Sequence, residues 1–324
     1  MILGADRPSV IAHIRTLAEA RRLNDKAELD DPCLSEEKKM ALIADLKKHR
    51  AKYSFPANRK AANRIMQYSA KKVNRKTEYV GLEKIAGITD GAIITHNHFN
   101  QFDSTAVTSL IEKKDGKTVC TIIEETNLAL PGILGFLMQN GDTIPITGNF
   151  DYMRGDFVKQ MQQVLGQKDY ILIYPEQEMW FNYRKPRPGK RGAYYYAAMF
   201  GKPVISLFTE MIDDEGMDDE NFRNVRWRVH VLDPLYPDPN KSLRKNSIEM
   251  AKKDDEQRKA AYERIYGRPL SYDPEPDDIA GYMGPDWELE KFLAQNQNKA
   301  ADEMTDKSAG QPDPAILSPA FEKA

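Results

Sequence analysis

The sequence predicts an α/β protein in which helices flank a layered mixed sheet, with a helical module at the N-terminus. Two observations lead to this prediction. Between residues 80 and 235, short apolar or alternating runs that are typical of strands take turns with helical stretches. Before residue 80, apolar residues recur at helical spacing instead. The chain has 324 residues, which is enough for one large domain or two small ones.

Residues 8–76 are predicted to be helical, and residues 1–79 to form an N-terminal helical module. In the stretch 35–50, Ser35 can cap a helix, and the glutamates that follow it favour the positive end of the helix dipole. Apolar side chains then recur at helical spacing, and residues 59–72 continue in the same way.

Residues 80–235 are predicted to form the catalytic α/β core. One run, 225–232, alternates apolar and polar residues as a half-buried strand does. The other predicted strands are mostly continuous apolar runs, as expected for strands covered on both faces: they are 91–95, 118–125, 142–146, 170–175 and 202–208. The predicted helices between them are 104–113, 133–139, 152–165 and 192–200.

The predicted C-terminal part, residues 236–293, combines a helix with an extended segment that wraps around the core. The helix is expected over 247–266, and the extended segment over 268–285, which is rich in Pro, Asp and Gly. Residues 294–324 are mostly Ala, Gln, Asn, Lys and Pro, which offer little to bury, and we expect them to be disordered.

Composition excludes several classes of protein. The two cysteines, Cys33 and Cys120, lack CxxC spacing, which excludes a zinc ribbon and argues against a disulfide framework. The longest apolar stretch, 128–138, is too short to span a bilayer, and the N-terminus lacks the apolar core of a signal peptide. We therefore expect a cytoplasmic protein, and peripheral association with the inner face of the cell membrane stays open.

Charge is unevenly distributed along the chain. The formal net charge is 47 − 49 = −2, which argues against a generally basic nucleic-acid binder. However, 11 basic residues and no acidic one lie between Lys47 and Lys76, and a second run without acidic residues extends from Phe181 to Lys202. Residues 210–220 are strongly acidic by contrast. The basic runs suit an anionic partner, namely a lipid headgroup, a phosphate or nucleic acid, although a solvated helix face explains the first run equally well.

One cluster, THNHFNQFDST at residues 95–105, carries the clearest chemistry. It follows a predicted strand and contains His98 and Asp103, separated by four residues. A carboxylate beside a histidine fixes the imidazole tautomer and stabilises the imidazolium, so the pair can act as a general base. Asp103 as a plain helix cap is the alternative. Metal binding by His96, His98 and Asp103 lacks a supporting third histidine, so no metal is predicted.

A second segment, residues 174–207, places a basic loop after a predicted strand. The strand ends near Tyr174, Pro175 and Glu176 turn the chain, and arginines and lysines follow. Strand-end loops are where α/β proteins place ligands. Basic residues beside a general base therefore indicate an anionic group on the substrate, such as phosphate.

Four short motifs occur in order between residues 80 and 210. The first, N-H-x4-D, comprises Asn97, His98 and Asp103, and a G-x-x-I-P-I segment at 141–146 follows. Tyr174, Pro175 and Glu176 form the third motif, and a strand that starts with Pro203 approximates the fourth. In this order the motifs resemble those of the glycerolipid (lysophospholipid) acyltransferases, the group that includes 1-acyl-glycerol-3-phosphate acyltransferases.

The chain departs from that family at positions that hold the acceptor's phosphate. Residues 147–149 lack the arginine that ends the family's second motif, and residues 177–179 replace the Gly-Thr-Arg of the third. The resemblance therefore implies either an acceptor without phosphate or substitute cations. The candidate substitutes are Arg154, Arg184, Lys185, Lys190 and Arg191.

The resemblance implies transfer of a fatty acyl group from acyl-CoA or acyl carrier protein to a hydroxyl of a lysophospholipid or glycerol-phosphate-type acceptor, at an anionic membrane surface and with no cofactor. His98 would be the general base and Asp103 its partner, while Asn97, Glu176 and the substitute cations would bind substrate. No G-x-S-x-G motif indicates a hydrolase. The alternatives are a non-catalytic binding protein for anionic lipid or nucleic acid, or a degenerate relative. No nucleic-acid-binding motif occurs, so nucleic acid is not the expected partner, and the oligomeric state is left open.

Overall fold

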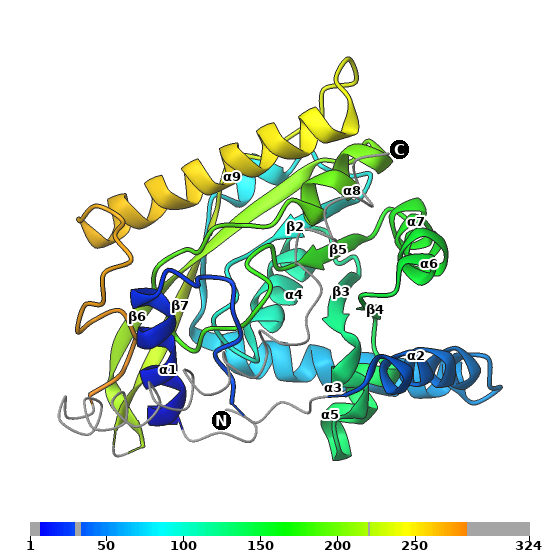
Figure 1. The fold of residues 1–324 in the computed structure, drawn as a ribbon, viewed down its shortest axis with the longest axis horizontal. Helices are drawn as coiled ribbons and strands as arrows, with labels where there is room; N and C mark the ends of the chain where they lie inside the picture. The colour runs from blue at the N-terminus through cyan, green and yellow to red at the C-terminus, as the bar shows by residue number, and fades with distance from the viewer. Residues whose placement is uncertain (1–6, 30–33, 220, 284–324) are drawn as a thin grey trace, which may run out of the picture.

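The computed structural model describes residues 7–29, 34–219 and 221–283 (Figure 1). Within them, seven strands form one sheet in the order β1-β7-β6-β2-β5-β3-β4. The strands are β1 (Glu78–Val80), β2 (Ala92–Thr95), β3 (Val119–Glu124), β4 (Thr143–Ile146), β5 (Tyr170–Ile173), β6 (Val204–Asp219) and β7 (Phe222–Val231).

The sheet is mixed. Strands β2 to β6 run parallel, with Ile93 of β2 opposite Ile171 of β5 on one side and Val204 of β6 on the other. Strand β7 returns antiparallel to β6, and β1 pairs with β7 in parallel at the edge of the sheet. The predicted α/β class, with a layered mixed sheet flanked by helices, is confirmed.

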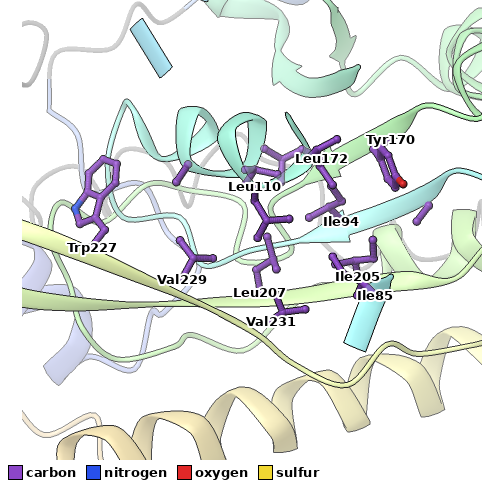
Figure 2. Packing of buried hydrophobic residues seen from close by; sticks show 14 of the residues in the cluster. Ile85, Ile94, Leu110, Tyr170, Leu172, Ile205, Leu207, Trp227, Val229 and Val231 are labelled. Carbon is purple, nitrogen blue, oxygen red and sulfur yellow. The ribbon is translucent and has the colours of Figure 1, made fainter. Parts of the chain in front are cut away.

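Helices cover both faces of the sheet because successive residues of a buried strand point to opposite sides. On one face, Ile93 of β2 packs in a cluster with α7 (Val158–Gly166), α8 (Gly192–Phe200) and α9 (Leu243–Tyr266). On the other face, Ile94 packs under α4 (Asp103–Lys114), and Figure 2 shows Leu110 of that helix above the strands. Burial on both sides explains why the core strands are continuous apolar runs.

The β6–β7 hairpin differs from the prediction. The apolar run 202–208 predicted a short strand, but β6 continues to Asp219 through the acidic residues. Acidic side chains disfavour strands by propensity, but here the ladder to β7 satisfies the backbone, and Glu210 lies opposite Arg228. Lys76 pairs with Asp214 at 2.9 Å farther along the hairpin. Tertiary pairing thus outweighs local preference.

The N-terminal helices pack on separate parts of the sheet domain. Helix α1 (Arg7–Glu19) buries Ile11 in a cluster with Trp180 and Phe222. Helix α2 (Glu36–Arg50) begins after Ser35, whose hydroxyl caps it as predicted, and α3 (Phe55–Val73) lies beside α4 and α5. Helix α5 (Gly132–Asn140), α6 (Phe150–Tyr152) and a π-helical turn (Met153–Phe157) complete the helices before α8.

After the sheet, α9 (yellow in Figure 1) runs along α8 and is followed by an extended segment. This segment returns to the core, where Ile279 bridges to Tyr183 and Tyr282 bridges to Phe222. The predicted tail 294–324 lies outside the described residues. In the described part of the chain, every helix is too short or too polar to cross a membrane.

Candidate active site

The candidate site lies where two neighbouring parallel strands end. His98 follows β2 by three residues, Tyr174 follows β5 directly, and Glu176 follows β5 by three residues. The carboxyl ends of parallel neighbours meet at one edge of a sheet, where α/β proteins bind ligands. The fold thus brings the first and third sequence motifs together.

His98 and Asp103 form a hydrogen-bonded pair. The Nδ1 atom of His98 lies 2.8 Å from Oδ2 of Asp103. An ionised carboxylate can only accept, so in the neutral imidazole Nδ1 carries the proton and Nε2 the lone pair. The His98 side chain is 21% exposed, whereas that of Asp103 is 2% exposed. This arrangement presents a histidine that can take up a proton, backed by a charge that solvent hardly reaches.

The Asp103 carboxylate is held by further donors. Oδ2 also accepts the backbone N–H groups of Phe99 and Asn100, at 3.0 and 3.2 Å. Burial alone would raise the pKa of Asp103, but the charge of His98 and hydrogen bonds from His98 and Tyr174 bring it below its ordinary value. Asp103 is the first residue of α4 rather than its cap, so plain helix capping does not explain it.

Tyr174 is part of the site although sequence reasoning treated it only as a motif position. Its ring stacks on the His98 imidazole, with centroids 3.9 Å apart and planes 16° apart. Its hydroxyl donates to Oδ1 of Asp103 at 2.5 Å. The available signal was its place at the end of β5, directly before Pro175 and Glu176.

The residues before His98 fasten the turn to β6. Asn97, predicted to bind substrate, is 2% exposed and accepts the Thr209 N–H at 2.9 Å. The Nε2 atom of His96 lies 2.7 Å from the Thr209 hydroxyl. Burial lowers the pKa of His96 to about 4, so this ring is neutral at pH 7. Both side chains hold the turn in place from inside the core.

Glu176, also predicted to bind substrate, is 1% exposed, and its contacts are with protein. Its Oε2 accepts the His98 N–H at 3.3 Å and lies 3.1 Å from the Arg187 guanidinium. Its Oε1 accepts the Arg187 N–H at 3.0 Å. Glu176 therefore joins the third motif to the backbone of the first. Arg187, which is fully buried and lies over Trp180, was missed because nothing local marks it as buried.

The basic loop divides into a buried and an exposed part. Arg184 and Lys185 are buried. Arg184 pairs with Asp213, and Lys185 pairs with Asp278. The charges of Arg184 and Lys185 are therefore already neutralised by carboxylates inside the fold.

Three of the predicted cations stay exposed: Lys190, Arg191 and Arg154. The Lys190 N–H donates to the Pro175 carbonyl at 2.7 Å, which places this residue beside the third motif. Arg154 lies on the π-helical turn, over the Phe150 ring. Among the described residues, no carboxylate pairs with any of the three.

One acidic group in the described chain has the spacing of a metal site. Carboxylate oxygens of Glu275, Asp277 and Asp278 lie within 4.8 Å of one another. Lys185 and Arg268 already pair with these carboxylates, at 2.7 to 3.3 Å for the close contacts. The cluster is therefore an internal ion-pair network that joins the basic loop to the C-terminal segment.

Comparison with known proteins gives a match to one family model and a similar solved structure. Residues 56–209, which include His98, Asp103 and Glu176, match the Acyltransferase family model. A similar solved structure is that of the 1-acyl-sn-glycerophosphate acyltransferase PlsC from Thermotoga maritima, at 14% identity and a TM-score of 0.45, covering 81% of this chain and 97% of that one. The sequence matches none of the curated proteins with which it was compared. The part of this chain that is similar to the acyltransferase family is therefore residues 56–209.

Proposed function

We propose that this acyltransferase moves a fatty acyl group from a thioester, either acyl-CoA or acyl carrier protein, to a hydroxyl of a lysophospholipid or glycerol-phosphate-type acceptor. The observation that carries the proposal is the His98–Asp103 pair at the end of β2, with a buried carboxylate on Nδ1 and the imidazole partly exposed. This is the geometry that a general base needs.

In the proposed reaction, Nε2 of His98 takes the proton of the acceptor hydroxyl. The oxygen attacks the thioester carbonyl, the C–S bond breaks, and the thiolate leaves with the proton that His98 returns. Asp103 stabilises the imidazolium that exists between these two transfers. No acyl-enzyme is required, and a positioned base of this kind contributes about 10²–10⁴ in rate.

We propose that Lys190 and Arg191 contact the anionic group of the acceptor, with Arg154 as a further candidate. These are the predicted cations whose charges stay exposed, whereas Arg184 and Lys185 are paired inside the fold. Asn97 and Glu176 then support binding indirectly, because they hold the turn that carries His98.

We also propose that the surface of α2 and α3 docks on an anionic membrane. These helices carry most of the basic run 47–76, and near-surface basic residues contribute about 1 kcal/mol each on anionic lipid. Tyr53 is fully exposed between the helices, Tyr68 is exposed on α3, and Ile133 is exposed on the neighbouring α5. Aromatic and aliphatic side chains among cations suit the headgroup region.

The test is release of thiol from palmitoyl-CoA and from palmitoyl acyl carrier protein, with lysophosphatidic acid, glycerol 3-phosphate, other lysophospholipids and a glycolipid as acceptors. Wild type and His98→Ala are compared, with folding checked by circular dichroism. We expect acceptor-dependent release that the folded variant loses. Release without any acceptor would mean thioester hydrolysis instead. No release with either donor would favour a binding protein or a degenerate acyltransferase.

A further inference from the structure

Helix α9 connects the two strand ends that carry the candidate site. Asp254 and Arg258 lie four residues apart on α9, and therefore on the same side of the helix. The Thr95 hydroxyl, at the end of β2, donates to Oδ2 of Asp254 at 2.9 Å. Arg258 lies 3.3 Å from the same oxygen and 3.5 Å from Oε1 of Glu176, just after β5.

Glu176 extends this connection to the catalytic turn. Its other oxygen, Oε2, accepts the backbone N–H of His98. Thr95, Asp254, Arg258 and Glu176 are each at most 1% exposed. A continuous buried chain of polar contacts thus runs from α9 to the backbone of the proposed base.

Arg187 does not make Arg258 redundant. Arg187 is the other cation on Glu176, but its guanidinium also donates to the carbonyls of Leu23, His98 and Glu178. Arg258 contacts Glu176 with a different set of partners. Its guanidinium also contacts Asp254 on α9 and donates to the Tyr194 hydroxyl on α8. Each arginine therefore fixes Glu176 against a different part of the fold.

Stability alone does not account for this network. Removing charges from water is costly, and well-packed apolar residues of similar volume often stabilise a protein at least as well as a buried ion pair. A buried ion-pair network holds its side chains in one geometry, because only one arrangement satisfies all its partners. In this protein, the group held in place is the turn that carries His98. Helix α9 also lies beyond residues 56–209, which match the family model.

We propose that Arg258 is a positioning residue: anchored by Asp254, it fixes Glu176 and, through it, the backbone of His98, so that the imidazole keeps its reactive orientation. The proposal rests on the proposed role of His98 as the base. It gives α9 a part in the site although no residue of α9 is proposed to touch substrate.

The kinetic test compares Arg258→Met, which keeps the bulk of the side chain, with Arg258→Lys, which keeps the charge. Arg268→Met is the matched control, because Arg268 also bonds a tyrosine hydroxyl and carboxylates but does not contact Glu176. We expect Arg258→Met to lower kcat by about 10- to 100-fold with KM unchanged, as misplacement of a catalytic group does. Arg258→Lys should recover part of the loss, and Arg268→Met should keep the wild-type kcat.

A spectroscopic readout separates positioning from general damage. The chain has five histidines, so protein labelled with ¹⁵N-histidine gives a simple amide spectrum, in which the signal missing from His98→Ala belongs to His98. This signal should move in Arg258→Met, return toward its wild-type position in Arg258→Lys and stay in place in Arg268→Met. If Arg258→Met does not fold, Asp254→Asn removes the anchor without a change of shape and should move the same signal.

The outcomes are distinct. A folded Arg258→Met or Asp254→Asn with wild-type kcat and an unmoved His98 signal would overturn the positioning role, while an inactive His98→Ala would leave the proposed function in place. A loss of kcat without movement of the His98 signal would also overturn it, since the damage would then lie elsewhere. A fully active His98→Ala would instead overturn the proposed function itself.

Discussion

Among the described residues, two histidines lie 2.8 Å from a carboxylate, yet their surroundings differ. His98 uses Nδ1 to reach Asp103, which is 2% exposed and, within the described part of the chain, pairs with no cation other than the imidazole. His230 uses Nε2 to reach Glu210, which also pairs with Arg228 at 3.2 Å. The first pair follows a strand end, whereas the second lies within the ladder between β6 and β7.

This difference shows what a histidine–carboxylate pair needs in order to act as a base. Glu210 is already neutralised by a permanent cation, so it has less charge to offer an imidazolium. The His230 side chain belongs to a cross-strand ladder, where such pairs stabilise the sheet. The hydrogen-bond partners of Asp103 other than His98 are neutral donors, so its negative charge can stabilise the imidazolium. The ring of Tyr174 stacks on one face of the imidazole. Whether a histidine–carboxylate pair can act as a base therefore depends on the other groups that surround it in the fold.

The largest expected effect separates the two histidines directly. His98→Ala should lower acceptor-dependent turnover by about 10²–10⁴-fold, because it removes the proposed base. His230→Ala should keep wild-type turnover and lose only the half-buried hydrogen bond to Glu210, worth about 1 kcal/mol. Steady-state thiol release and urea unfolding of both variants test this. Equal loss of turnover in the two would refute the contrast.

The carboxylates should differ in the same way. Asp103→Asn should lower turnover by about 10²-fold or more, because an amide neither fixes the productive tautomer nor stabilises the imidazolium. Glu210→Gln should leave turnover unchanged. The measurement is kcat for both variants, with circular dichroism as a check on folding. An active Asp103→Asn would reduce the carboxylate to a structural role.

His96, two residues before His98, should affect stability through pH. Its pKa is about 4 in the folded protein against an ordinary 6.5, so the unfolded chain binds a proton first as pH falls. The stability that the neutral His96 ring contributes is fully present above pH 6.5 and is lost as the pH falls from 6.5 to 4. Between pH 7 and 4, wild type should lose about 3 kcal/mol more free energy of unfolding than His96→Gln.

Urea unfolding of both proteins across this pH range is the measurement. Carboxylates common to the two proteins cancel in the difference. Parallel stability curves would show that His96 is not held neutral in the folded state.

The smallest expected effect concerns Tyr174, which contacts both His98 and Asp103. Tyr174→Phe keeps the ring that stacks on His98 but removes the hydroxyl that donates to Asp103. Asp103 retains two backbone donors, so the loss should be about 1 kcal/mol, or about fivefold in kcat. A loss as large as that of Asp103→Asn would mean that the hydroxyl, rather than the carboxylate, controls the imidazole.

The sequence by itself determined the α/β class, the core strands and the His98–Asp103 pair. Buried parallel strands must be apolar on both faces, so runs such as 91–95 and 170–175 are visible without a structure. His98 and Asp103 are five residues apart, and a turn from a strand into a helix brings such residues together locally. The strands and the His98–Asp103 pair can be predicted from the sequence because both depend on residues that are close together along the chain.

Only the tertiary structure decided which of the basic side chains are buried and which stay exposed. Lys185 looks like Lys190 in the sequence, but it is buried because Asp278, 93 residues later, neutralises it. The acidic end of β6 became a strand because β7 pairs with it. Glu176 is buried beside two arginines, Arg187 in the same loop and Arg258, which reaches it from α9, 82 residues away. A charge costs much free energy to bury alone and little when it is paired. Its role therefore depends on partners that sequence spacing cannot reveal.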